Sequence, residues 1–258
     1  MRDINVLVNN GVDVQKSLEL FVEMDIYNET LGEFLLGINK KVADIKAKME
    51  EGDMPEYAIL VHSLKSDSKY LGFTKLAEFS YQHEMESKAN NITFVYNHYN
   101  ELMTEVNRII HVVEEYLGED IAKEVAPQPA SNTKEKAILV ADDSDIIRNY
   151  VYKIFNDSYE VISAHDGQNA INIIEADVNN KIVAMLLDLN MPNVNGFEVL
   201  EYFKANSLFV KIPVSIITGD DSKDTIQKAF NYPIVDVISK PFNERDVKRV
   251  VEQTISYK

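Results

Sequence analysis

The sequence contains no cysteine among its 258 residues. That absence excludes disulfide bonds, thiolate metal sites and cysteine nucleophiles. The sequence also lacks any run approaching about 18 consecutive apolar residues, the length needed to cross a membrane. Its first residues, MRDINVLVNN, show no basic region followed by a long apolar run. We therefore expect no signal peptide, no membrane partner and a cytoplasmic location.

Positive charge is scarce, with 26 Lys and Arg against 42 Asp and Glu and a formal net charge of −16. Both halves of the chain are acidic, so neither offers the basic footprint that binding to a nucleic-acid backbone requires. The sequence has no Gly-rich phosphate loop and no candidate ATP pocket. Hydrophobic residues nevertheless make up 45% of the chain, which is enough to build packed cores in one large or two ordinary domains.

The pattern of apolar residues divides the chain in two. Residues 1–118 show helical periodicity, with breaks near MDIYNET, EEGDMP, LGFT and KANNITF, and predict an all-α helical bundle. Residues 119–136 contain two prolines and no apolar periodicity, which predicts an interdomain linker. Residues 137–258 alternate five short apolar runs with amphipathic segments. This alternation predicts an α/β domain with a parallel sheet and helices on both faces.

Polar side chains end the predicted strands of the second domain. The first predicted strand ends in Asp142 and Asp143, the third strand in Asp188, the fourth in Thr218 and the fifth in Lys240. Because ligands bind at the carboxyl ends of parallel strands, these side chains are expected to meet at one edge. A single Asp after a strand is commonly a helix N-cap, but three neighbouring carboxylates repel one another unless a cation joins them. A hard divalent ion, Mg²⁺, fits that position.

The same edge carries the parts needed for phosphoryl transfer. Asp188 can act as a carboxylate nucleophile and form an acyl phosphate. Thr218 can hydrogen-bond a phosphoryl oxygen, and Lys240 can form an ion pair with one. Since the chain shows no site for a nucleotide donor, we expect the donor to be another protein or a small phosphodonor.

Residues 137–258 resemble the response-regulator receiver domain through ILVADDS, LLDLNMPNVNGFEVL, IITGDD and ISKPF, in that order. The resemblance implies a flavodoxin-like fold with five parallel strands in the order 2-1-3-4-5. It also implies Asp188 as phosphoacceptor and Asp143 as a direct metal ligand, with Asp142 acting nearby or through water. The backbone carbonyl of Asn190 would be a further ligand.

The resemblance assigns three further features. Thr218 becomes the switch hydroxyl, Lys240 the lysine that binds the phosphoryl group, and the Lys240–Pro241 bond is expected to be cis. Val237 departs from the family pattern, because it stands where the family usually has an aromatic residue. Phosphorylation chemistry does not depend on that residue, but the aromatic part of the usual activation mechanism does.

The stretch YAILVHSLKSDSKYLG, residues 57–72, predicts a helix that begins after Asp53 and ends before Gly72. Its core stripe is Tyr57, Leu60, Leu64, Ser68 and Leu71. His62 falls opposite that stripe and is expected to face water. A solvated polar face is one interpretation, and a nucleophilic imidazole supported by Lys65 is the other.

The segment VHSLKSDSKYLGFTKLAEF resembles the histidine phosphotransfer domain. Five residues match the motif of that family: His62, Leu64, Lys65, Leu71 and Gly72. The likeness extends over residues 10–118 and implies an HPt-like four-helix bundle. It makes His62 the phosphorylated imidazole and Lys65 its electrostatic partner. Ser66 replaces the glycine that this family usually has one helical turn after the histidine.

Together the two resemblances predict a phosphorelay protein that accepts phosphate on Asp188 and on His62. Its partners would be a sensor histidine kinase or phosphorylated receivers, and a downstream receiver or phosphotransfer protein. We expect no enzyme activity beyond self-catalysed phosphorylation and dephosphorylation of the receiver. One alternative is a phosphorylation-switched binding module whose helical part is an inert scaffold. A Mg²⁺-dependent phosphatase is a second, although Asn190 stands where its DxD motif needs an aspartate.

Overall fold

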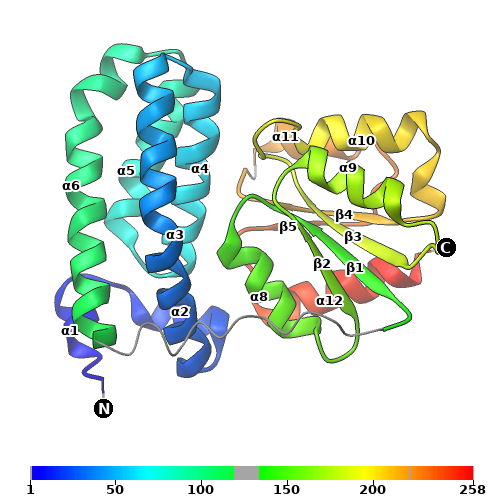
Figure 1. The fold of residues 1–258 in the computed structure, drawn as a ribbon, viewed down its shortest axis with the longest axis horizontal. Coiled ribbons are helices and arrows are strands. Elements are labelled where there is room, and N and C mark those ends of the chain that lie inside the picture. The colour runs from blue at the N-terminus through cyan, green and yellow to red at the C-terminus, as the bar shows by residue number, and fades with distance from the viewer. Residues whose placement is uncertain (1, 119–133, 221, 258) are drawn as a thin grey trace. The chain divides into compact units, whose positions relative to one another are not determined.

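The computed structural model describes residues 2–118, 134–220 and 222–257 (Figure 1). The chain divides into two compact units, Met1–Pro129 and Ala130–Lys258. Most of the predicted linker, 119–133 of 119–136, lies outside the described residues. Each unit is therefore described by itself.

The first unit is entirely helical in its described part. Two short helices precede four long ones, namely α1 (Asn5–Asn9), α2 (Val14–Phe21), α3 (Met24–Glu51), α4 (Met54–Tyr70), α5 (Thr74–Lys88) and α6 (Ile92–Leu117). The long helices lie side by side, and each contacts two others in the cyclic order α3, α4, α5, α6 (Figure 1). This arrangement is an up-and-down four-helix bundle. None of the described helices is long and apolar enough to cross a membrane.

Helix boundaries agree with most of the predicted breaks. The exception is MDIYNET, which forms the start of α3 and not a break, since the chain interrupts its helices earlier, at Val22 and Glu23. Val22 has a positive φ of 64°, which ends α2 before α3 starts. The last helix carries an apolar stripe that is buried along its whole length, at 3% exposure or less: Leu102, Val106, Ile109, Val113 and Leu117.

Two local devices fix the ends of α4. The side chain of Asp53 accepts a hydrogen bond from the Glu56 amide and caps the first turn. After the last turn, Gly72 has a φ of 75°, and a Cβ there would collide with the Asp13 backbone. The Asp13 amide donates to the Gly72 carbonyl at 2.8 Å, so the turn before α5 is held against the start of α2. Only glycine suits both the dihedral and the close approach.

The second unit is a five-stranded parallel sheet in the order β2-β1-β3-β4-β5, which confirms the predicted order. Its strands are β1 (Ala137–Ala141), β2 (Glu160–Ala164), β3 (Ile182–Asp188), β4 (Val214–Thr218) and β5 (Val237–Ser239). Its helices are α8 (Asp145–Phe155), α9 (Gly167–Ala176), α10 (Gly196–Ala205), the 3-10 turn η2 (Leu208–Val210), α11 (Lys223–Ala229) and α12 (Glu244–Ser256).

Helices cover both faces of this sheet, as the alternating pattern predicted. α9, α10 and α11 lie on one face, and α8 and α12 on the other (Figure 1). All five residues of β1 and of β4 are buried, which explains their continuous apolar sequences. Strand order reverses between β1 and β3, so a crevice for ligands is expected at their carboxyl ends. The Lys240–Pro241 peptide bond that follows β5 is cis, as predicted.

Candidate phosphoacceptor sites

Three carboxylates meet at the carboxyl edge of the sheet. Asp142 and Asp143 directly follow β1, and Asp188 is the last residue of β3, the strand beside it. One oxygen from each lies within 4.8 Å of the others. Asp142 and Asp188 are fully buried, whereas Asp143 is half-buried. The structure thus brings together the three predicted aspartates.

Lys240 supplies positive charge to this cluster from the end of β5. Its Nζ lies 2.6 Å from Asp188 Oδ2 and 2.7 Å from Asp142 Oδ2. Burial alone would lower the pKa of Lys240, but the charges of Asp142 and Asp188 outweigh burial and raise it above its usual value. Burial and the Asp188 charge raise the pKa of Asp142 to about 6, against the opposing effect of Lys240. The edge is therefore a buried group of charges that one lysine partly neutralises.

The donor set at this edge fits a hard divalent cation. Three carboxylate oxygens within 4.8 Å, one of them on a half-buried residue, match the oxygen ligands and the accessible side that Mg²⁺ prefers. The Asn190 amide donates to Asp188 Oδ1 at 3.2 Å, which holds the β3–α10 loop next to the cluster. This places the Asn190 backbone beside the carboxylates, as its predicted role as a carbonyl ligand requires.

Thr218 ends β4, the next strand after β3. In the register of the sheet, Asp188 pairs with Ile217, so Thr218 stands one residue further toward the carboxyl edge. Its side chain is fully buried, and its hydroxyl accepts a hydrogen bond from the Asp220 amide at 3.1 Å. The Thr218 hydroxyl therefore lies beside the end of β3, which carries Asp188. Its hydrogen bond ties it to the loop before α11.

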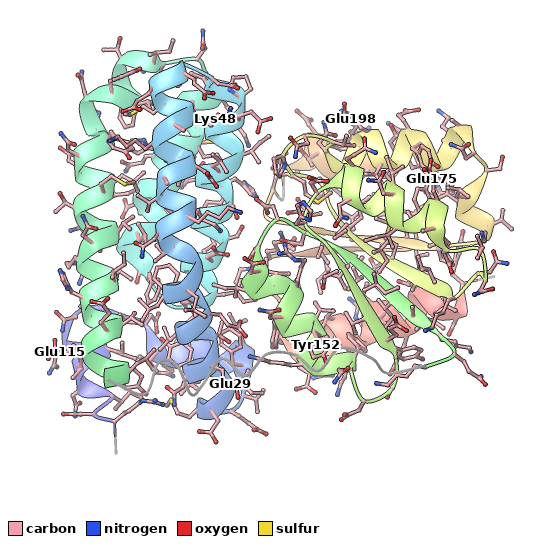
Figure 2. The ribbon with its side chains drawn as sticks, viewed as in Figure 1. Glu29, Lys48, Glu115, Tyr152, Glu175 and Glu198 are labelled. Atoms are coloured by element: carbon pink, nitrogen blue, oxygen red, sulfur yellow. The ribbon has the colours of Figure 1, made fainter. Side chains whose placement is uncertain are left out.

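Helix α10 starts in contact with the backbone of Asp188. A Cβ at Gly196 would collide with the Asp188 carbonyl, so glycine permits this approach. Glu198, labelled in Figure 2, completes a capping box with Asn195 at the start of the helix. The β3–α10 connection is thus rigidly joined to the predicted phosphoacceptor.

A groove of about 550 Å³ lies next to this connection. Its lining residues come from the β3–α10 loop, α10, α11 and the loop before β5: Leu189, Asn190, Asn195, Phe197, Glu198, Glu201, Lys228 and Tyr232. The hydroxyl of Tyr232 donates to Glu201 at 2.6 Å, and its ring lies 6.5 Å from that of Phe197. Val237, the residue that departs from the family pattern, is half-buried in β5. An aromatic side chain therefore lines the groove beside Asn190, but from position 232.

His62 is 1% exposed in the whole chain, so the expectation that it faces water is wrong. The core stripe of α4 was otherwise predicted well, since Tyr57, Leu64 and Ser68 are fully buried and only Leu60 is half-buried. The sequence interpretation allowed for one buried face, whereas residues 61–68 of α4 are all buried in the chain. α5 packs closely along α4 and contributes Glu84 to the side of α4 that carries His62.

Glu84 is the residue that the sequence interpretation missed. Its Oε1 lies 2.7 Å from His62 Nδ1, and its Oε2 lies 2.5 Å from Lys65 Nζ. Lys88 Nζ lies 2.6 Å from Oε1. Burial would raise the pKa of Glu84, but His62 and Lys65 outweigh burial and hold it well below its usual value. Glu84 is thus an ionised carboxylate among a histidine and two lysines.

This contact defines the tautomer of His62. An ionised carboxylate only accepts hydrogen bonds, so the proton between Glu84 and His62 belongs to Nδ1. Lys65 Nζ, 3.2 Å from the same nitrogen, then acts as a nearby charge and not as a donor to it. With Nδ1 protonated, a neutral ring has its basic lone pair on Nε2. Glu84 therefore makes Nε2 the nucleophilic nitrogen.

On its other side, α4 is tied to α3. Lys41 Nζ donates to Ser63 Oγ at 2.8 Å and to Asp67 Oδ2 at 2.5 Å. Asp67 is only 5% exposed, so its charge is balanced by Lys41 inside the chain. Lys65 and Asp67 of α4 are therefore held by partners from two neighbouring helices, Glu84 of α5 and Lys41 of α3.

His83 is 2% exposed and lies in the core of the helical unit. Its Nδ1 lies 2.7 Å from the Tyr57 hydroxyl, and burial lowers its pKa to about 4. His98 is half-buried, while His111 and His165 are exposed. Among these histidines, His62 alone has the glutamate and lysine contacts described above.

Comparison with known proteins follows this geometry. Residues 138–252 match the response regulator receiver domain family and form a receiver domain. Chemotaxis protein CheY1 of Helicobacter pylori is 29% identical over 117 residues, which cover 45% of this chain and 93% of that protein. Hybrid signal transduction histidine kinase D of Dictyostelium discoideum is 26% identical over 144 residues, covering 55% of this chain and 9% of the kinase.

Two further matches concern the same region. The rice protein Two-component response regulator-like PRR37 is 30% identical over 114 residues, which span 44% of this chain but 15% of that protein. The solved structure of Vibrio cholerae chemotaxis protein CheY4 is 26% identical and covers 46% of this chain and 98% of that one, with a TM-score of 0.42. The relatives connect the receiver domain with two-component signalling.

Proposed function

We propose that this chain is a phosphorelay protein that carries a phosphoryl group on Asp188 and on His62. The single observation that carries the proposal is the cluster at Asp188. Its buried carboxylate lies 2.6 Å from Lys240 Nζ and within reach of the Asp142 and Asp143 carboxylates. A nucleophile, a cation and further oxygen ligands are the parts that phosphoryl transfer to a carboxylate requires.

Each residue of this edge has a chemical role in the proposal. Asp142, Asp143 and Asp188, with the Asn190 carbonyl, would hold a divalent cation. When bound, Mg²⁺ supplies positive charge that offsets the negative charge of the transferring group. Asp188 attacks phosphorus and forms the acyl phosphate, while the bond to the donor breaks and its electron pair stays with the donor. Lys240 then binds a phosphoryl oxygen, and the Thr218 hydroxyl donates to another.

The second acceptor is Nε2 of His62. Its lone pair attacks phosphorus, the bond to the Asp188 oxygen or to a partner's aspartate breaks, and that carboxylate keeps the electron pair. The Nδ1 proton stays hydrogen-bonded to Glu84, whose negative charge offsets the positive charge that develops on the ring. Lys65, 3.2 Å from Nδ1, adds positive charge next to the same ring.

Proteins with phosphorylated histidine or aspartate are the partners that suit these two acceptors. These are a sensor histidine kinase or a phosphorylated receiver as donor, and a receiver or phosphotransfer protein as recipient. The chain would act on its own residues by self-catalysed phosphorylation and dephosphorylation and would not turn over a separate substrate.

The proposal is tested by labelling the full chain with acetyl phosphate and Mg²⁺, which should place a base-labile phosphate on Asp188. Asp188→Asn or chelation of the metal should abolish the label. Asp166→Asn is the matched control, because Asp166 is also buried after a strand but caps α9 and lies outside the carboxylate cluster. Label that survives in Asp188→Asn would overturn the assignment.

A second candidate function follows from the burial of His62. A histidine that is 1% exposed and held by a buried glutamate also suits a structural role. In that case phosphorylation of Asp188 switches a binding surface, and the helical unit is an inert scaffold. Incubation with phosphoramidate, which phosphorylates histidines, distinguishes the two. An acid-labile label absent from His62→Gln supports the relay, and no label on His62 supports the scaffold.

A further inference from the structure

Ser66 is a buried hydroxyl that the fold leaves without a local function. It is 3% exposed, and its Oγ has no hydrogen-bond partner among the residues that the structure describes. A buried hydroxyl without a partner costs about 1–3 kcal/mol, so such a group needs an explanation, for example a ligand that is not always present.

Two buried serines of the same two helices behave differently, whereas a third, Ser80 of α5, is also buried without a hydrogen-bond partner among the described residues. Ser68 Oγ donates to the Leu64 carbonyl at 2.7 Å, and Ser87 Oγ donates to the His83 carbonyl at 2.7 Å. This bond to the carbonyl four residues earlier is the usual solution for serine inside a helix. Ser66 does not form it, although it occupies the same α4 helix as Ser68. Its hydroxyl therefore remains available to a different acceptor.

The position of Ser66 indicates which acceptor that is. Ser66 follows His62 by four residues, and side chains with this spacing are neighbours, with Cβ atoms about 5–6 Å apart. Helical side chains also tilt toward the N-terminus, so Ser66 leans over the turn that bears His62. A phosphoryl group on the imidazole would add three acceptor oxygens close to this donor.

The surrounding charges permit an anion here. Lys65 lies 3.2 Å from His62 Nδ1, and Lys41 neutralises Asp67, the residue next to Ser66. Glu84 opposes an anion, but it already has Lys65 and Lys88 within ion-pair distance. A phosphoryl group would therefore meet both a hydrogen-bond donor and nearby positive charge.

We propose that the Ser66 hydroxyl donates a hydrogen bond to the phosphoryl group on His62 Nε2 and prolongs the lifetime of the phosphohistidine. Ser66 is a positioning residue in this step and gives up no proton. The phosphoryl group must lose this bond before it leaves the site. The inference rests on the proposed role of His62 as an acceptor.

The test uses the full chain in an Asp188→Asn background, so that phosphate cannot pass to the receiver. The chain is labelled with phosphoramidate, the reagent is removed, and the acid-labile phosphate is followed by ³¹P NMR. In Ser66→Ala we expect loss of phosphohistidine to be about three- to tenfold faster, from the strength of one hydrogen bond. We also expect a shifted ³¹P resonance, which a purely structural defect would not produce.

Two matched variants complete the experiment. Ser66→Thr keeps a hydroxyl and should retain most of the lifetime, whereas Ser68→Ala removes a buried hydroxyl that bonds within its own helix and should leave it unchanged. Equal lifetimes and resonances in the parent and Ser66→Ala would overturn the Ser66 proposal while leaving His62 as an acceptor. Acid-labile label that is the same in the parent and in His62→Gln, and so absent from His62, would overturn both.

Discussion

Glu84 of α5 holds the Nδ1 of His62 of α4 at 2.7 Å inside the helical unit. The two residues are 22 positions apart and belong to helices joined by the turn at Gly72. This contact decides the tautomer of His62 and places a carboxylate beside Lys65. It therefore affects both the stability of the unit and the chemistry proposed for His62.

Replacement of His62 should lower stability. A histidine facing water would make His62→Gln nearly neutral, within about 0.5 kcal/mol. The buried contact with Glu84 instead predicts a loss of about 1–3 kcal/mol in the free energy of unfolding, because glutamine cannot place a donor identically and leaves a buried charge less well bonded. Chemical denaturation followed by circular dichroism measures this loss. His111→Gln, at an exposed position of α6, is the control and should show no change.

Replacement of Glu84 should slow labelling of His62. In Glu84→Gln the side chain no longer requires the proton to stay on Nδ1, and it no longer offsets positive charge on the ring. Carboxylates that orient metal-binding histidines in this way contribute about 10–100-fold, and we expect a decrease of similar size here. The measurement is the initial rate of acid-labile labelling by phosphoramidate. Glu78→Gln, on the exposed side of α5, should label at the parent rate, and a parent rate in Glu84→Gln would contradict the tautomer argument.

Removal of Lys240 should destabilise the receiver domain in a metal-dependent way. Lys240→Ala leaves the buried Asp142 and Asp188 carboxylates without their shared cation, which predicts a loss of about 3–5 kcal/mol. Added Mg²⁺ should restore part of the loss, since it supplies positive charge to the same oxygens. Urea denaturation with and without Mg²⁺ tests both statements. Lys248→Ala, which removes only an exposed pair with Glu244, is the control.

The burial of His83 predicts a specific pH dependence. Its pKa is lowered from 6.5 to about 4 in the folded chain, so the unfolded chain takes up this proton first as pH falls. Above pH 6.5 His83 is neutral in both states and causes no loss of stability. As the pH falls from 6.5 toward 4, the free energy of unfolding decreases, and the decrease from this group amounts to about 3 kcal/mol. NMR titration of the imidazole resonances, assigned with His83→Gln, should give a midpoint near 4. A midpoint near 6.5 would show that the ring is not buried as described.

The residues that meet at the carboxyl edge of the receiver sheet could be predicted, because their meeting depends only on strand order and on where the strands end. Strand order and side-chain alternation in a parallel sheet place Asp142, Asp188 and Lys240 at one edge once the strands are recognised. The sequence also marks where each strand ends, since a polar residue follows an apolar run. Local pattern and long-range position therefore agree in this domain.

The His62 site could not be predicted to the same depth. A helical wheel identifies the most apolar face of α4 but does not show how many neighbours cover the helix, so it placed His62 in water. Glu84 lies on another helix, and nothing in its local sequence marks it. One signal was available: in two antiparallel helices, residues about equally far from the turn face each other, and His62 and Glu84 lie at similar distances from Gly72.

The groove beside Asn190 makes this chain suitable for an optical reporter. Because the sequence contains no cysteine, Glu201→Cys would create a single attachment point for a dye within the groove. The groove shares Leu189 and Asn190 with the loop that leaves Asp188, and Gly196 holds α10 against the Asp188 carbonyl. When Asp188 is phosphorylated as proposed, a dye at this position would report the change through the loop that leaves Asp188, and it would give a fluorescence readout without radioactive label.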